Sequence, residues 1–227
     1  MRGLKRGLGW LFGAAWRGAF LAAAGYLGAR VMAGGGGTTP LPFALAMQRL
    51  DLGRLGEVAL QGALGLMALV LVLRPLPPGP CRAILGGMIM GAAAVPVFHQ
   101  STLFVLHQTA RLVPERGFLF APLPFLADMP ALYGLMLAGA ALGGVLALLL
   151  RLVWALPDLL MGFLWGAGLL TLLHGTFPRV PGFDSPWWMW LVINGGWGWG
   201  AAFLMRPLAL RGAEDAGREQ DRPEHAI

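Results

Sequence analysis

The stretch AILGGMIMGAAAVPVFHQSTLFVL, residues 83–106, is apolar until it reaches the polar run HQST at 99–102. At about 1.5 Å per residue, a helix of this length crosses the roughly 30 Å of hydrocarbon in a bilayer. Polar side chains within such a helix must find hydrogen-bond partners in the protein. The run therefore marks either a packed helix interface or a binding site, and the sequence leaves both interpretations open.

The composition indicates a membrane protein. The 227-residue chain is 57% hydrophobic and 12% charged, with a mean hydropathy of +0.66, whereas a soluble domain has about 25% charged residues. Its net charge of +6 comes from Lys and Arg placed singly at the ends of apolar segments, which argues against a nucleic-acid-binding face. Because Cys81 is the single cysteine, neither an internal disulfide nor a cysteine-based metal site is expected.

Six apolar segments have the length of a membrane span and are predicted to be helices. They lie at 10–32, 55–73, 83–106, 130–150, 157–175 and 187–205. We therefore expect an all-α, polytopic integral membrane protein with six transmembrane helices. The expected divisions are an N-terminal helix with a Gly/Pro-rich outer loop (1–54), a transmembrane helical bundle (55–206) and a charged, disordered cytoplasmic tail (207–227).

The first segment allows three interpretations. Arg17 interrupts it, and a mid-helix arginine costs about 2.5 to 3.5 kcal/mol on insertion scales unless it snorkels to the nearer face. The basic start and short apolar core also resemble a signal peptide. The segment is thus a spanning helix, an interfacial amphipathic helix or a cleaved signal.

The positive-inside rule orients the remaining segments. Eight Lys and Arg residues near segment ends fall on one side of the membrane and six on the other. The eight are Arg2, Lys5, Arg6, Arg74, Arg82, Arg151, Arg206 and Arg211. This bias predicts that both termini lie in the cytoplasm.

Several polar residues share one predicted depth. If residues 83–106 run outward, His99 lies about 24 Å along the helix, roughly 6 Å below the outer hydrocarbon boundary. Other helices place polar side chains nearby, with His107 at the rim. The predicted outward-facing polar layer consists of Gln61, His99, Gln100, His107, His174 and Asn194. It is either a ligand or ion site or a set of interhelical hydrogen bonds, worth about 0.6 kcal/mol each.

Pro96 adds an irregularity below this layer. Because proline cannot donate a hydrogen bond, we predict that the carbonyl of Ala92 lacks its usual helical partner and that the helix is kinked.

A b-type haem would need one histidine from each of two helices at matching depth, and His99 with His174 fulfils that requirement. A metal site of three or four protein ligands has few candidates. Phosphate-binding glycine loops, His-Glu-x-x-His and Gly-x-Ser-x-Gly are absent from the sequence. We expect neither enzymatic activity nor a cofactor, with haem b as the alternative.

Glycines four residues apart occur in five of the six predicted helices. The pairs are Gly9/Gly13, Gly87/Gly91, Gly139/Gly143, Gly162/Gly166 and Gly196/Gly200. Such pairs permit close helix packing, but a chain with 35 glycines in 227 residues contains most of them by chance. The pattern does not specify which helices touch.

Four sequence features together resemble a family of small bacterial inner-membrane proteins of unknown function. They are FHQ at 98–100, APLPF at 121–125, Pro130 at the start of a helix and NGGWG at 194–198. The chain differs at 125–130, where FLADMP stands for the family's Phe-Gly-Val-Pro, and at 140–144, where AALGG stands for Phe-Trp-Gly-Gly. The resemblance covers 83–206. It implies an inner-membrane, four-helix core preceded by two N-terminal helices, and it implies no activity.

We therefore expect a structural or accessory subunit that packs against a larger membrane complex through its glycine-rich helices. The alternative is a small transporter or ligand-binding membrane protein that uses the polar layer. The expected partners are the lipid bilayer and another membrane protein, not nucleic acid.

Overall fold

The structure, a computed structural model, consists almost wholly of helices. It describes residues 2–34, 48, 50–77, 79–110, 112, 122–123, 129–153, 155–172, 187–208 and 210. In chain order the helices are α1 (Arg2–Gly34), α3 (Leu52–Leu73), α4 (Pro80–Ala94), the π-helical η1 (Val95–His99), α5 (Gln100–Ala110), α6 (Ala131–Leu152), α7 (Asp158–Leu164), the π-helical η3 (Trp165–Leu170), α9 (Trp187–Met205) and the 3-10 turn η4 (Arg206–Leu208). A two-residue ladder pairs β1 (Pro122–Leu123) with β2 (Met129–Pro130). The all-α prediction is confirmed.

Three helices are long and apolar enough to cross a membrane. They are α3, the continuous helix Pro80–His107 and α6. These match the segments predicted at 55–73, 83–106 and 130–150. The apolar helix Asp158–Leu170 is shorter. By length and composition, the chain is a membrane-embedded protein.

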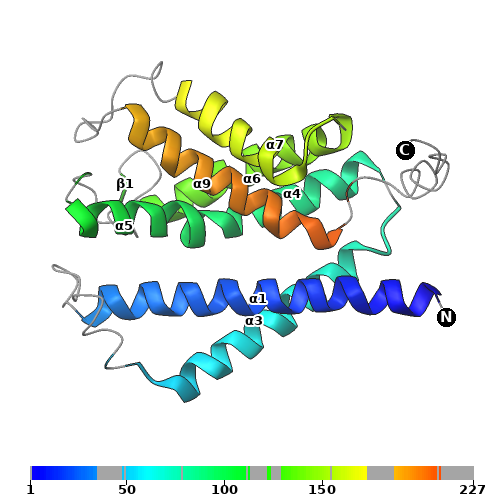
Figure 1. Ribbon diagram of the computed structural model, residues 1–227, viewed down its shortest axis with the longest axis horizontal. Coiled ribbons are helices and arrows are strands. Elements are labelled where there is room, and N and C mark those ends of the chain that lie inside the picture. The colour runs from blue at the N-terminus through cyan, green and yellow to red at the C-terminus, as the bar shows by residue number, and fades with distance from the viewer. Residues whose placement is uncertain are drawn as a thin grey trace, which may run out of the picture.

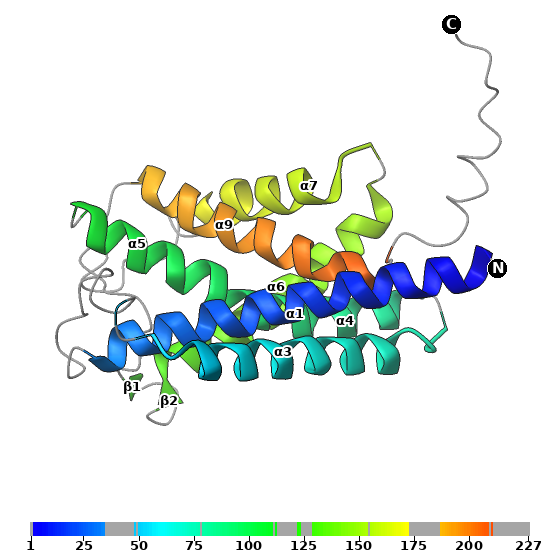
Figure 2. The same ribbon diagram turned by 60° about the horizontal axis from the view of Figure 1, so that its bottom comes forward.

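The helices pair as antiparallel hairpins in sequence order, α1 with α3, α4 with α6 and α7 with α9. Helices α1 and α5 run along the long axis of the molecule, and α3 and α9 run obliquely to it (Figure 1). In both views the α1/α3 hairpin forms one side and the α7/α9 hairpin the other, with α4 and α6 between them (Figures 1 and 2). Helix α9 therefore contacts α4 and η1 as well as its hairpin partner.

Glycines close the α4/α6 hairpin by direct backbone contact. A Cβ atom on Gly87 would lie 2.4 Å from the carbonyl oxygen of Gly143, and one on Gly91 would lie 2.2 Å from that of Gly139. Both distances are shorter than any side chain tolerates. The four glycines face each other in antiparallel register, so two of the glycine pairs in the sequence form one interface.

Glycines also form close backbone contacts in the other two hairpins. A Cβ on Gly18 of α1 would lie 2.1 Å from the carbonyl oxygen of Gly62 of α3. A Cβ on Gly162 of α7 would lie 2.4 Å from that of Gly198 of α9. Each hairpin therefore brings two backbones together where neither has a side chain.

Arg17 is accommodated inside the protein. Its side chain is 9% exposed, and its Nη1 donates a hydrogen bond of 2.7 Å to the carbonyl of Gly13, one turn nearer the N-terminus. Its guanidinium carbon lies 4.7 Å from the ring centres of both Trp16 and Phe203. Cation–π contacts of this kind stabilise a desolvated cation. Since Phe203 belongs to α9, the arginine links α1 to the core.

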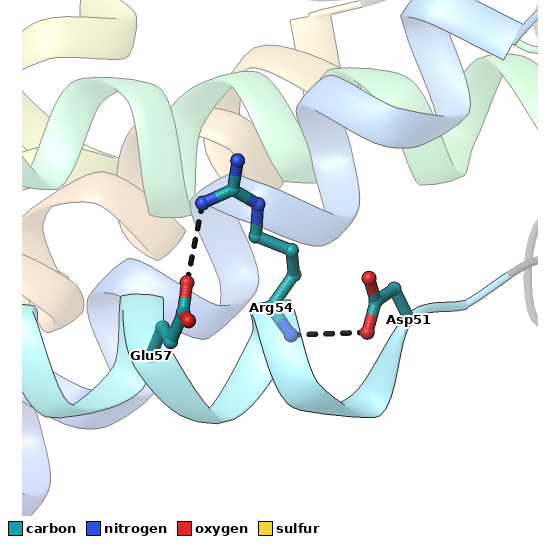
Figure 3. Close-up of polar contacts among 3 residues, drawn as sticks. All are labelled: Asp51, Arg54 and Glu57. Carbon is teal, nitrogen blue, oxygen red and sulfur yellow. Dashed lines mark hydrogen bonds and ion pairs between the residues drawn. The ribbon is translucent and has the colours of Figure 1, made fainter.

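The start of α3 is fixed by a side-chain cap. The Asp51 carboxylate accepts a hydrogen bond of 3.1 Å from the backbone N–H of Arg54, whose guanidinium lies 3.1 Å from Glu57 (Figure 3). An aspartate at this position stabilises a helix N-terminus by about 1 kcal/mol. Most of the predicted Gly/Pro-rich loop, and the predicted tail beyond Leu210, lie outside the described residues.

Candidate functional site

Two π-helical segments flank α9. In η1, the backbone N–H of Gln100 donates to the carbonyl of Val95, five residues earlier, and Pro96 contributes no donor. The second segment, η3, ends at Leu170, and Thr171 is its C-cap. Single π-turns within α-helices are frequent at functional sites. A polar residue directly follows each segment, Gln100 after η1 and Thr171 after η3.

The predicted consequence of Pro96 is corrected by the structure. The carbonyl of Ala92 accepts a hydrogen bond from the backbone N–H of Val95, three residues later. In a regular α-helix that N–H would serve Gly91. The carbonyl left without its helical donor is therefore that of Gly91.

The Gly91 carbonyl accepts a hydrogen bond from a tryptophan that lies outside the predicted polar layer. The indole Nε1 of Trp197 donates to the carbonyl of Gly91 at 3.0 Å, and the Trp197 side chain is 2% exposed. Apolar periodicity could not have predicted this contact, because it depends on the register shift at Pro96.

His99 and Gln100 form one polar pair. Gln100 is fully buried, and its Nε2 lies 3.1 Å from Nδ1 of the half-buried His99. The Gln100 amide and the His99 imidazole are thus joined by a hydrogen bond between adjacent residues of the chain.

The haem hypothesis required a second histidine at the depth of His99. That residue, His174, lies outside the described residues. Among the residues that the structure describes, no group of three His, Cys, Asp or Glu side chains is placed to hold a metal ion.

Asn194 and Thr171 form a second polar pair. The Asn194 side chain is 3% exposed, and its Nδ2 lies 3.4 Å from the Thr171 hydroxyl. Two residues further along α9, a Cβ on Gly196 would lie 3.2 Å from the hydroxyl of Thr102. Thr171 thus contacts α9 at Asn194, and Thr102 of α5 lies against another face of the same helix at Gly196.

The other members of the predicted layer are placed differently. His107 is half-buried on α5, and the Gln61 side chain is exposed on α3. Gln61 lies next to Gly62, which packs against α1. The structure thus buries Gln100 and Asn194 inside the core and leaves Gln61 on its surface.

Comparisons with family models, curated proteins and solved structures give no match to this chain.

Proposed function

We propose that this protein is a structural or accessory subunit of a larger complex in the bacterial inner membrane, with six membrane-crossing helices and both termini in the cytoplasm. The observation that carries the proposal is the exposed amide of Gln61. Helices α1 and α9, and the apolar Asp158–Leu170 helix extended beyond its described end, would complete the six spans. The resemblance to small inner-membrane proteins supports the same location.

Gln61 lies near the middle of its helix. It is about 14 Å from Leu52 and about 18 Å from Leu73, the two ends of α3, at 1.5 Å per residue. In a membrane it would therefore lie within the hydrocarbon region, on the side of the midplane nearer Arg54 and Glu57. An amide without hydrogen bonds costs free energy there, because lipid chains offer neither donors nor acceptors.

Helix α3 is also the least covered of the long apolar helices. Of its most apolar 18-residue window 11% is buried, against 39% for Pro80–His107 and 33% for α6. The exposed positions recur every three to four residues and thus form one stripe. This α3 stripe consists of Glu57, Leu60, Gln61, Leu64, Gly65, Ala68, Leu71 and Val72. It combines small residues with one amide, which is typical of transmembrane helix interfaces.

A different subunit fits the α3 stripe better than a second copy of this chain. A two-fold pair of α3 helices would bring each Gln61 to its equivalent, and Glu57, one turn earlier on the same face, would face the other Glu57. Although each Glu57 pairs with Arg54 of its own helix, two carboxylates at that position weaken the symmetric pair. We therefore infer a partner helix with an amide or hydroxyl at the depth of Gln61.

Photo-crosslinking in native membranes tests this proposal. A photoreactive amino acid replaces Gln61 in one variant and the fully buried Val70 of the same helix in the control. We expect position 61, and not position 70, to crosslink to a transmembrane peptide of one other membrane protein. A crosslink to a second copy of this chain, or to lipid alone, would overturn the accessory-subunit proposal.

The π-segments support a second candidate function, a small transporter or ligand-binding protein. The polar layer at His99, Gln100 and Asn194 would then contact a small polar substrate from the outer side, with His107 near the rim. Saturable stabilisation of the purified chain by a small polar solute, lost in Gln100→Leu, would favour this alternative.

A further inference from the structure

Three arginines converge at the end of the bundle where α3 leads into α4. Arg74 caps α3, Arg82 lies in the first turn of α4, and Arg151 lies in the last turn of α6. Each arginine thus lies at one end of a helix that is long and apolar enough to cross a membrane. The arginines therefore lie at a membrane boundary. Figure 1 shows the end of α3 and the start of α4 meeting there.

Hydrogen bonds to backbone carbonyls hold two of the guanidinium groups. Nη1 of Arg82 donates to the carbonyl of Arg74 at 3.2 Å, and its Nη2 donates to the carbonyl of Leu208. Nη1 of Arg151 lies 3.4 Å from the carbonyl of Leu210. The segment after α9 thus ties the cluster together, and neutral carbonyls do not cancel its positive charge.

The guanidinium groups of Arg82 and Arg74 have N–H donors that no described side chain accepts. Nε of Arg82 is buried without a hydrogen-bond partner. The guanidinium of Arg74 packs over the ring of Trp10 at 4.2 Å, and no hydrogen bond joins that guanidinium to another described side chain. Between described residues the structure holds one salt bridge, Arg54 to Glu57 at the opposite end of α3.

The positive charges of the neighbouring arginines also repel one another. Burial lowers the pKa of the Arg74 guanidinium, and the neighbouring charge of Arg82 lowers it further. A bound anion would relieve both effects, since an opposite charge stabilises the protonated form. Phosphate matches the planar fork of arginine donors especially well.

Exposed apolar side chains lie on the membrane side of two of the arginines. Val72 lies two residues before Arg74 in α3, and Leu85 lies one turn after Arg82 in α4. A ligand at this place would therefore meet cationic donors at the boundary and an apolar surface toward the membrane interior.

We propose that Arg74, Arg82 and Arg151 bind the phosphate group of an anionic phospholipid, whose acyl chains lie along the adjacent apolar helix surface. Basic clusters between transmembrane helices at the cytoplasmic boundary are suited to such headgroups. A soluble phosphate ion offers the same charged group as the lipid headgroup. Only a lipid also has acyl chains that contact the apolar surface, so we favour the lipid as the ligand. This site is independent of the α3 stripe and of any partner subunit.

Titration with a fluorescent phosphatidylglycerol tests the site. The full chain in neutral detergent is titrated with this lipid and with a fluorescent phosphatidylcholine of the same acyl chains. We expect tight binding of phosphatidylglycerol only, and weakening by about fivefold in Arg74→Gln, since one arginine contributes about 1 kcal/mol to anionic lipid binding. Arg151→Gln provides a second variant if Arg74→Gln loses helix content by circular dichroism.

The control is Arg54→Gln, which removes the same charge at the other end of α3. It should bind phosphatidylglycerol as the unchanged chain does. Equal weakening in Arg54→Gln would show non-specific electrostatics and overturn the site. Equal binding of both lipids, or complete displacement by excess inorganic phosphate, would overturn it as well.

Discussion

The indole nitrogen of Trp197 donates a hydrogen bond to the carbonyl oxygen of Gly91 across the α4/α9 interface, 3.0 Å away. That oxygen is available because Pro96 follows Val95, whose N–H turns to Ala92. One proline thus produces a π-segment, frees a carbonyl and attaches the last long helix to the centre of the bundle.

Trp197→Phe should destabilise the protein because it leaves the buried carbonyl of Gly91 without a donor. A buried acceptor that loses its partner costs about 1 to 3 kcal/mol. Reversible unfolding in mixed micelles measures the change in the free energy of unfolding. The matched control is Trp199→Phe, at a tryptophan that is 38% exposed; an equal loss in both variants would contradict the role of the Gly91 hydrogen bond.

Gly143→Ala should separate α4 from α6. The new methyl group would lie 2.3 Å from the carbonyl oxygen of Gly87, so the helices must move apart, at a cost at or above the roughly 3 kcal/mol upper range for overpacking. The same substitution at Gly25 is the control, since a Cβ there meets nothing within 4 Å. Thermal unfolding of the two variants in detergent provides the comparison, and similar midpoints would argue against glycine-mediated packing.

Apolar length predicted where the helices lie but not all of their bounds. The predicted 187–205 matches α9 (Trp187–Met205), and the predicted 55–73 begins three residues after α3 does, whereas the predicted 10–32 begins eight residues after α1 (Arg2–Gly34). The orientation of side chains was harder to predict. Because α3 is apolar on every face beyond Gln61, its sequence cannot show whether Gln61 faces the core or the lipid. Depth along a helix follows from a fixed rise per residue, but the direction a side chain faces depends on which neighbour packs where.

The helix contacts could not be predicted for a similar reason. Gly87 and Gly91 were visible as a pair, but many glycines permit close approach, and only the three-dimensional arrangement places Gly139 and Gly143 opposite them. The pairing of Gln100 with His99 was likewise hidden, because adjacent residues on a helix point about 100° apart.

Cys81 tests the proposed orientation of the chain. It is the single cysteine and is exposed at the start of α4, on the side proposed to be cytoplasmic. A membrane-impermeant maleimide should label it in inverted inner-membrane vesicles and not in intact spheroplasts. Leu112→Cys in a Cys81→Ser background, at an exposed residue after α5, should give the reverse pattern. Labelling of Cys81 in spheroplasts would place the termini outside.

The contact between His99 and Gln100 separates the packing interpretation from the ligand-binding one. A double-mutant cycle with His99→Ala and Gln100→Leu should give a coupling energy of about 0.6 to 1.7 kcal/mol, the range for side-chain hydrogen bonds in membrane bundles. The cycle is measured by unfolding in mixed micelles without added ligand. The cycle with Asn194→Leu and Thr171→Val is the comparison, and it should give less because that contact is longer, 3.4 Å against 3.1 Å. Coupling near zero for His99 and Gln100 would mean that this contact does not hold the bundle together, and would contradict the packing interpretation for this pair.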